Sequence, residues 1–278
     1  MLILLAIFTL YFGGLPLLIL SVQKINPQPR LDPISPEQWP PAVAAPMSRA
    51  EHELYNLGFS IVARFGMPDA VPNVSNLVTM LVHYQTGDKA MITAMWAQSE
   101  GSWQLKGFYT EFSTRFEDGR VFDTSNTPSL SSFQTAPNET KTRAPELKDL
   151  NELYSLHRFV MREAGVTGRK IVFDAKDAAP FLLRIWREGF DEQARFGRFR
   201  FNGTHYVPTL KGAFLMTWAE LFAFKQIRRA QANAATKALL TRWRAAGMQG
   251  RDAPTSVIVR PETPLPPQPG AVPISVAR

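Results

Sequence analysis

The chain has 278 residues, a formal net charge of +7 at pH 7 and no cysteine. Without cysteine, disulfide frameworks, thiolate zinc sites, iron–sulfur clusters and cysteine nucleophiles are excluded. Hydrophobic residues make up 45% of the chain and charged residues 20%, which are ordinary values for a globular protein.

The positive charge is concentrated in the second half of the chain. Residues 1–150 hold 11 Lys and Arg against 14 Asp and Glu, whereas residues 151–278 hold 20 against 10. Beside a membrane, a basic half is typical of a surface that contacts anionic lipid headgroups. Nucleic acid is the less favoured polyanion, although arginines and aromatic residues alternate in the stretch 184–201.

The first twenty-two residues, 1–22, contain no charged side chain and predict a transmembrane helix. In helical form they would span roughly 33 Å, enough for a hydrocarbon core of about 30 Å. The segment lacks the basic start and the cleavage site of a signal peptide, so we expect a retained anchor. Lys24 and Arg30 follow it, which predicts a single-pass protein of a bacterial inner membrane with its soluble part in the cytoplasm.

The rest of the chain divides into four segments. Residues 23–47 contain seven prolines and predict an extended linker. Residues 48–165 predict an α+β domain, and residues 166–247 predict a basic helical region. Residues 248–278 are rich in proline and predict a disordered or extended tail, which is a possible ligand for a partner protein.

Short apolar runs separated by turn residues predict a sheet between residues 59 and 124. The runs indicate four or five antiparallel strands in a meander. Helices at 49–57 and 146–164 flank it, and we expect helices to cover one face of this sheet. Residues 125–145 have few apolar side chains and predict a long surface loop.

The basic region begins with a predicted helix over about 178–195 and a hairpin turn at Asn202 and Gly203. The apolar stretch 210–224 contains Glu220 and is too short and too charged for an ordinary bilayer span. It suits an interfacial membrane helix or a core helix equally well, and the helical pattern continues to Gly247 as a long basic amphipathic helix. The interfacial interpretation predicts membrane contacts by Lys24, Trp218, Lys225, Arg228 and Arg229.

No motif in the sequence specifies a reaction. The four histidines lack metal-ligand spacing, and the chain contains no Walker loop, no G-x-S-x-G and no G-x-G-x-x-G. We therefore predict no catalytic residue, no metal and no cofactor. One candidate ligand pocket lies between the sheet and the helix 146–164, and it would use Tyr109, Asp123 and His157.

Two functional hypotheses follow. The favoured one is a non-enzymatic, membrane-anchored accessory or scaffold protein that contacts a membrane-protein partner. The alternative is a membrane-tethered enzyme or small-ligand binder that uses the pocket beside the helix 146–164. Convergent groups with perturbed pKa values in a deep pocket would favour the alternative.

Overall fold

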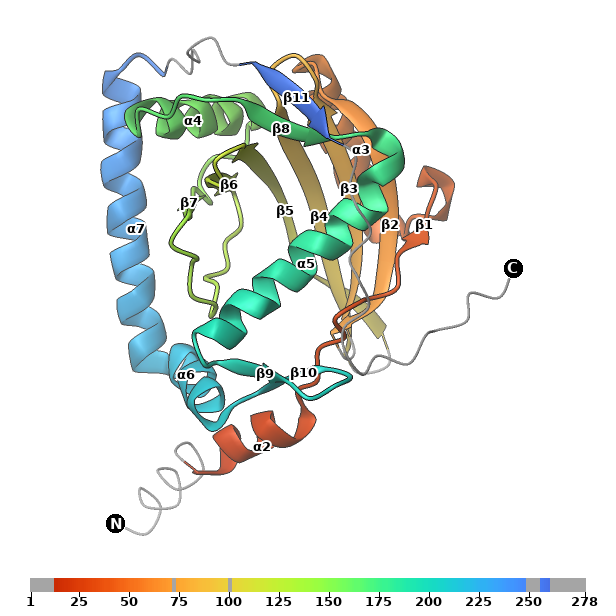
Figure 1. Ribbon diagram of the computed structural model, residues 1–278, viewed down its shortest axis with the longest axis vertical. Coiled ribbons are helices and arrows are strands. Elements are labelled where there is room, and N and C mark those ends of the chain that lie inside the picture. The colour runs from red at the N-terminus through yellow and green to blue at the C-terminus, as the bar shows by residue number, and fades with distance from the viewer. Residues whose placement is uncertain (1–12, 72–73, 100–101, 249–255, 261–278) are drawn as a thin grey trace.

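The computed structural model describes residues 13–71, 74–99, 102–248 and 256–260, and its fold is α+β with a mixed sheet (Figure 1). The predicted fold class is confirmed at this level. The main sheet contains nine strands: β1 (Asp32–Pro33), β2 (Ser60–Val71), β3 (Val74–His83), β4 (Asp88–Ser99), β5 (Ser102–Phe116), β6 (Val121–Ser125), β7 (Glu139–Arg143), β8 (Lys170–Phe173) and β11 (Val257–Arg260). The described helices are α2 (Leu15–Val22), α3 (Pro41–Asn56), α4 (Leu150–Glu163), α5 (Ala178–Arg195), α6 (Leu210–Glu220) and α7 (Phe222–Ala245), with short 3₁₀ helices η2 (Pro36–Gln38) and η3 (Ala175–Asp177).

The predicted antiparallel meander is confirmed and forms the centre of the sheet. Strands β1 to β6 are neighbours in chain order and pair antiparallel. β7 adds in parallel to β6, and it lies inside the stretch 125–145 that was predicted to be a loop. β8 pairs with the end of β5, and β11 pairs in parallel with β8. β11 lies in the Pro-rich tail, whose residues 249–255 and 261–278 are outside the described ranges.

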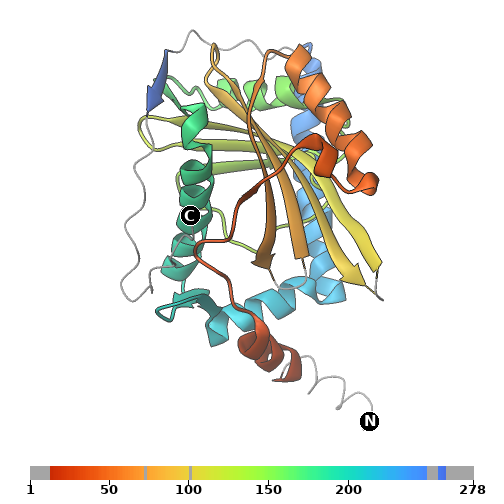
Figure 2. The same ribbon diagram turned by 90° about the vertical axis from the view of Figure 1, so that its right-hand side faces the viewer.

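Helices cover both faces of the sheet, whereas the sequence predicted helices on one face (Figure 2). On β3, Leu77 and Leu81 point to one face and pack with α3 and α4. Val78 and Met80 alternate with them and pack with α5 on the other face. Because each face needs apolar side chains, alternation between apolar and polar residues is weak along these strands.

The predicted transmembrane helix over residues 1–22 is not supported. Residues 1–12 lie outside the described ranges, and α2 is eight residues long and contacts α6. Within the described ranges, each helix is either too short or too polar to serve as a bilayer span.

The segment 23–47, predicted to be a linker, is packed onto the fold. Ile25 forms a bridge with Tyr206, and β1 pairs with the edge of β2. The helix predicted over 49–57 is α3, and it begins at Pro41 instead of Arg49. Proline at the first helical position has no N–H to leave unpaired, so the Pro-rich end of this segment starts a helix.

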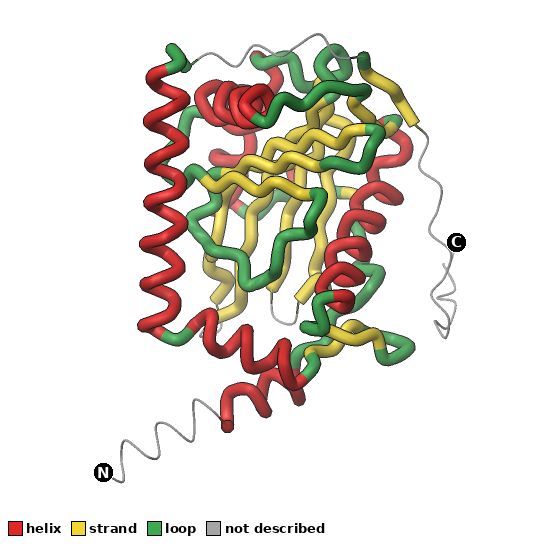
Figure 3. Tube along the Cα trace, turned by 60° about the vertical axis from the view of Figure 1, so that its left-hand side comes forward, coloured by secondary structure: helices red, strands yellow, loops and turns green. Residues whose placement is uncertain are grey.

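A hairpin forms at Asn202 and Gly203 as predicted, with strands β9 (Phe199–Phe201) and β10 (Tyr206–Pro208), but the two-residue turn that Asn-Gly predicts is wrong. Its connection is four residues long because the Asn202 side chain accepts hydrogen bonds from the backbone N–H groups of Thr204 and His205. The stretch 210–224 is divided between α6 and α7, which meet at an angle at Leu221 (Figure 3).

A buried ion pair joins the start of β4 to β8. The ammonium of Lys170 lies 3.0 Å from the carboxylate of Asp88, and both side chains are almost fully buried. Asp88 also accepts hydrogen bonds from Thr114 at 2.6 Å and from Tyr154 at 2.7 Å. Burial opposes ionisation, but Lys170 and these donors lower the pKa of Asp88 to about 2.

Replacing Lys170 by methionine should destabilise the protein by about 3 to 5 kcal/mol, because the Asp88 carboxylate would be left buried without its cation. Urea unfolding of the full-length protein measures this effect. The matched control is Lys176→Met, because that side chain is 72% exposed and its ion pair with Asp174 is 3.8 Å long. Equal losses in the two variants would contradict a structural role for the buried pair.

Candidate functional site

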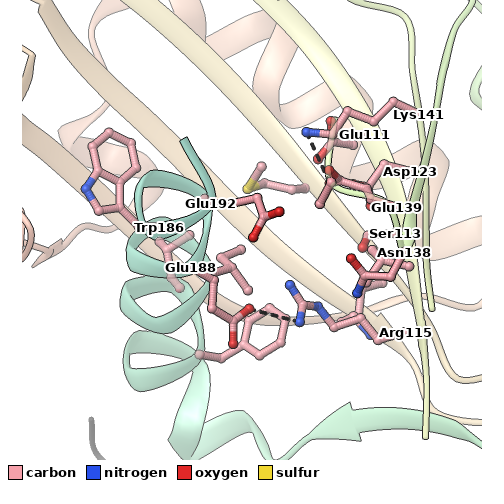
Figure 4. A pocket seen from close by; sticks show the side chains of 18 of the residues that line it. Glu111, Ser113, Arg115, Asp123, Asn138, Glu139, Lys141, Trp186, Glu188 and Glu192 are labelled. Atoms are coloured by element: carbon pink, nitrogen blue, oxygen red, sulfur yellow. Dashed lines mark hydrogen bonds and ion pairs between the residues drawn. The ribbon is translucent and has the colours of Figure 1, made fainter. Parts of the chain in front are cut away.

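A cavity of about 660 Å³ lies between the sheet and α5. The loop between β6 and β7 closes part of it, and Figure 4 shows side chains from α5 and from the strands pointing into the same space. Its main apolar lining consists of Met80, Met91, Phe133, Phe173, Phe181, Leu182, Ile185 and Trp186. Its polar lining includes Glu111, Ser113, Arg115, Asp123, Asn138, Glu139, Lys141, Glu188 and Glu192.

Two contacts hold the loop and α5 in place around the cavity. The amide of Gln193 accepts a hydrogen bond from the backbone N–H of Gln134 at 3.0 Å and donates one to its carbonyl at 2.8 Å. The indole N–H of Trp186 donates to the carbonyl of Asn26 at 2.9 Å. The walls of the cavity are therefore fixed by hydrogen bonds as well as by packing.

Three carboxyl groups from neighbouring strands meet on the polar wall. Glu111 is on β5, Asp123 on β6 and Glu139 on β7, and we call them the carboxyl cluster. Asp123 lies opposite Ser113 and Lys141 in the strand pairing. The ammonium of Lys141 is 3.1 Å from the carboxylate of Glu139 (Figure 4).

The environment of the carboxyl cluster favours its protonated forms. Burial, the charge of Glu111 and a hydrogen bond with Glu139 raise the pKa of Asp123 well above its usual value. Burial also raises the pKa of Glu111, with Lys141 acting in the opposite direction. Although burial opposes it, the charges of Glu139 and Asp123 raise the pKa of Lys141. The cluster attracts positive charge.

The basic groups elsewhere in the cavity have partners within the protein. Arg115 forms an ion pair with Glu188 on α5 at 3.1 Å. Lys89 donates to the carbonyl of Ile171 at 2.9 Å, and burial together with the charge of Arg115 lowers its pKa to about 7. In the carboxyl cluster, by contrast, three carboxyl groups share a single ammonium.

Gly189 lies in the middle of α5 and lines the cavity. A Cβ atom added there would meet nothing within 4 Å, so packing does not require glycine. Glycine inside a helix costs about 1 kcal/mol relative to alanine. Gly189 is exposed, so the space beside it is open at the edge of the cavity.

The structure separates the three residues that were predicted to share a pocket. Asp123 lines the cavity, and Tyr109 precedes Glu111 by two residues on the same face of β5. Burial raises the pKa of Tyr109 to about 12. His157 is on α4, which packs on the opposite face of the sheet. The cavity thus lies beside α5 instead of beside the helix predicted over 146–164.

His157 belongs to the buried network around Asp88. Thr114 donates its hydroxyl hydrogen to Asp88, so it accepts a hydrogen bond from Nε2 of His157 at 2.9 Å. Nδ1 then accepts from the hydroxyl of Thr124 at 3.0 Å. Burial lowers the pKa of His157 to about 4, against the attraction of Asp88. These contacts describe a neutral structural histidine.

The five predicted membrane-contacting residues lie at the end of the molecule where α2, α6 and α7 meet (Figure 1). Lys24 and Arg229 are exposed, and the ring of Trp218 stacks on Phe224. Two are engaged within the protein. Lys225 forms a 2.6 Å ion pair with Glu220, and Arg228 donates to the carbonyls of Ser131 and Ala219.

Most of the residues that line the cavity were not predicted from the sequence. Glu139 and Lys141 lie in the stretch predicted as a loop, so their place beside Asp123 was not visible. Glu111 lies on a strand with mixed side chains on both faces, and Gly189 was not singled out. The available signals were the single acidic residue of β5, Glu111, and a glycine inside a helical pattern.

No three His, Asp or Glu side chains in the described ranges are arranged to hold a metal ion. Comparison of the chain with protein-family models, with curated proteins and with solved structures gives no match. The interpretation of the site therefore depends on its own geometry.

Asp123→Asn should stabilise the protein at pH 8, because the surroundings of Asp123 disfavour its charged form. A carboxyl group with a raised pKa in the folded state contributes full stability below its unfolded pKa, and that stability is lost as the pH rises through the folded pKa. The variant should therefore lose less stability than the unmodified protein between pH 4 and pH 8, as measured by urea unfolding.

Glu146→Gln is the control for this comparison because Glu146 is exposed on the loop before α4. If the free energy of unfolding changed equally with pH in the unmodified protein and in Asp123→Asn, the raised pKa of Asp123 would be contradicted.

Proposed function

We propose that the protein binds a small organic molecule in the cavity beside α5. The observation that carries this proposal is a cavity of about 660 Å³ with one apolar wall and one wall of convergent polar groups. Ligand sites usually measure about 300 to 1,000 Å³ and combine apolar lining with a few placed polar groups. Gly189 supports the proposal because it keeps the space open at a cost to helix stability.

The lining favours a ligand with an apolar or aromatic body and a protonated amine. The aromatic rings of Phe133, Phe181 and Trp186 suit the apolar body. The carboxyl cluster suits the amine because three acids face one ammonium, whereas Arg115 is already paired with Glu188. A bound cation would replace the protons that the cluster holds.

We propose binding and no reaction. None of the four histidines lines the cavity, and His157 is enclosed on the other face of the sheet. Ser113 lies opposite Asp123 in the strand pairing, and no histidine among the lining residues is placed to deprotonate it.

Calorimetric titration with three indole compounds tests the proposal. Tryptamine, tryptophol and indole-3-acetate share a ring and end in an ammonium, a hydroxyl and a carboxylate. The full-length protein should bind tryptamine about tenfold or more tightly than tryptophol, because one charged hydrogen bond contributes roughly 1.5 to 3 kcal/mol. Indole-3-acetate should bind most weakly.

Two variants separate the cavity from its charge. Gly189→Leu should abolish binding of all three compounds and should not destabilise the protein, because the added Cβ meets no neighbour and a helix favours leucine over glycine. Glu111→Gln with Asp123→Asn should weaken tryptamine binding about tenfold and leave tryptophol unchanged, with Glu146→Gln as the control. Absence of any binding would contradict the proposed function, and tightest binding of indole-3-acetate would contradict the amine preference.

The accessory role predicted from the sequence is a second candidate, and the surface of α7 favours it. From Phe224 to Ala235 every residue of α7 is exposed except Arg228 and Ala232, which are half-buried. A helix with so little contact to its own fold is a suitable surface for a partner protein.

A photo-crosslinker attached at Ala234→Cys should give one adduct of defined mass in native membranes. The label is unique because the chain has no cysteine. The same label at Tyr55→Cys, on α3, should give none, since Tyr55 is exposed but lies on a helix that packs on the sheet. Lack of a discrete adduct from position 234 would count against a partner on α7.

A further inference from the structure

One end of the molecule carries a set of exposed apolar side chains. They lie on α2, α6 and the first turns of α7, which meet at the lower end of the molecule in Figures 1 and 3. We call this the basal surface, and it consists of Leu17, Leu18, Val22, Leu210, Trp218, Phe224 and Ile227. Their exposed fractions range from 40% for Trp218 to 62% for Leu17.

The apolar side chains of α2 point in two directions, some into the fold and some into solvent. Pro16 is buried, and Ile19 and Leu20 are half-buried on the helix that contacts α6. Leu17 and Leu18 are more than half exposed. A short surface helix normally places polar side chains on its outward side, so an apolar outward side indicates a partner that excludes water.

Trp218 and Phe224 extend the surface across the junction of α6 and α7. Their rings are parallel, with centroids 5.8 Å apart, and both remain at least 40% exposed. Tryptophan is enriched where a protein meets the boundary between lipid headgroups and acyl chains. This pair is the aromatic centre of the basal surface.

The chain itself indicates that the partner is a lipid bilayer. Residues 1–12 contain no charged side chain, and the described chain begins at residue 13, just before α2. Lys24 follows α2 and Arg229 lies two residues after Ile227, and both are exposed. The acidic Glu220 is neutralised by its ion pair with Lys225. Apolar side chains flanked by basic ones match an anionic membrane surface.

We propose that the basal surface docks on an anionic bilayer, with the apolar side chains in the headgroup and acyl boundary. This inference goes beyond ligand binding and is independent of the cavity. In this docked state Trp218, Phe224 and Ile227 contact the bilayer. Lys24 and Arg229 pair with its headgroups. It leaves Arg228 outside the contact because its guanidinium donates to the carbonyl of Ser131 at 2.6 Å.

The test uses a single fluorescent label on the full-length protein, which has no cysteine of its own. Ile227→Cys carries an environment-sensitive dye, and the protein is mixed with vesicles of phosphatidylcholine and phosphatidylglycerol that contain brominated acyl chains. The emission at position 227 should shift to shorter wavelength and be quenched severalfold. Tyr55→Cys, at a 69% exposed residue on α3, should show neither change.

Further arms distinguish the basal surface from other modes of attachment. Trp218→Asp should reduce quenching at position 227 about tenfold, and removal of phosphatidylglycerol should weaken binding. The proposal fails if the protein floats with the vesicles while the label at 227 stays in water, because another segment would then provide the attachment. It also fails if the emission shifts without vesicles in proportion to protein concentration, which would identify a second copy as the occupant.

Discussion

The buried ion pair between Asp88 and Lys170 is the constraint on which the rest of the structure depends. The two residues are 82 positions apart, and their pairing fixes β8 against the end of the meander. The chain passes from β8 through η3 directly into α5, so the position of β8 also decides where α5 lies on the sheet. In a water-free interior, such a pair is tolerated only when its remaining hydrogen-bonding groups are satisfied. Thr114 and Tyr154 satisfy those of Asp88.

The ion pair and the carboxyl cluster differ in how the sheet accommodates buried carboxyl groups. On the face covered by α4, Asp88 has a cation and hydroxyl donors and stays ionised. On the face covered by α5, Asp123 and Glu111 share one ammonium with Glu139, so their ionised forms are disfavoured. Natural proteins retain such unfavourable local arrangements, here buried carboxyl groups with too few cations, mainly at functional sites. Gly189, a second local cost, borders the same cavity.

Local patterns in the sequence predicted the elements that depend on local contacts. The meander, the hairpin at Asn202 and the helices near 150–163 and 178–195 all appeared from periodicity and turn residues. β7 and β11 were missed because each pairs in parallel with its neighbour, and a parallel pair has no tight turn to mark it in the sequence. His157 was recognised as unusual, but the face on which it lies depends on strand register, which the sequence alone did not provide.

The parallel pairing of β11 with β8 has a consequence for how the chain is made. β8 is four residues long, and each of its residues from Lys170 to Phe173 lies opposite a residue of β11. A ribosome-bound chain that has not yet reached residue 260 would present this side of β8 as an unpaired strand edge. Unpaired edges recruit strands from other chains, so the nascent protein carries this aggregation risk until β11 has been synthesised.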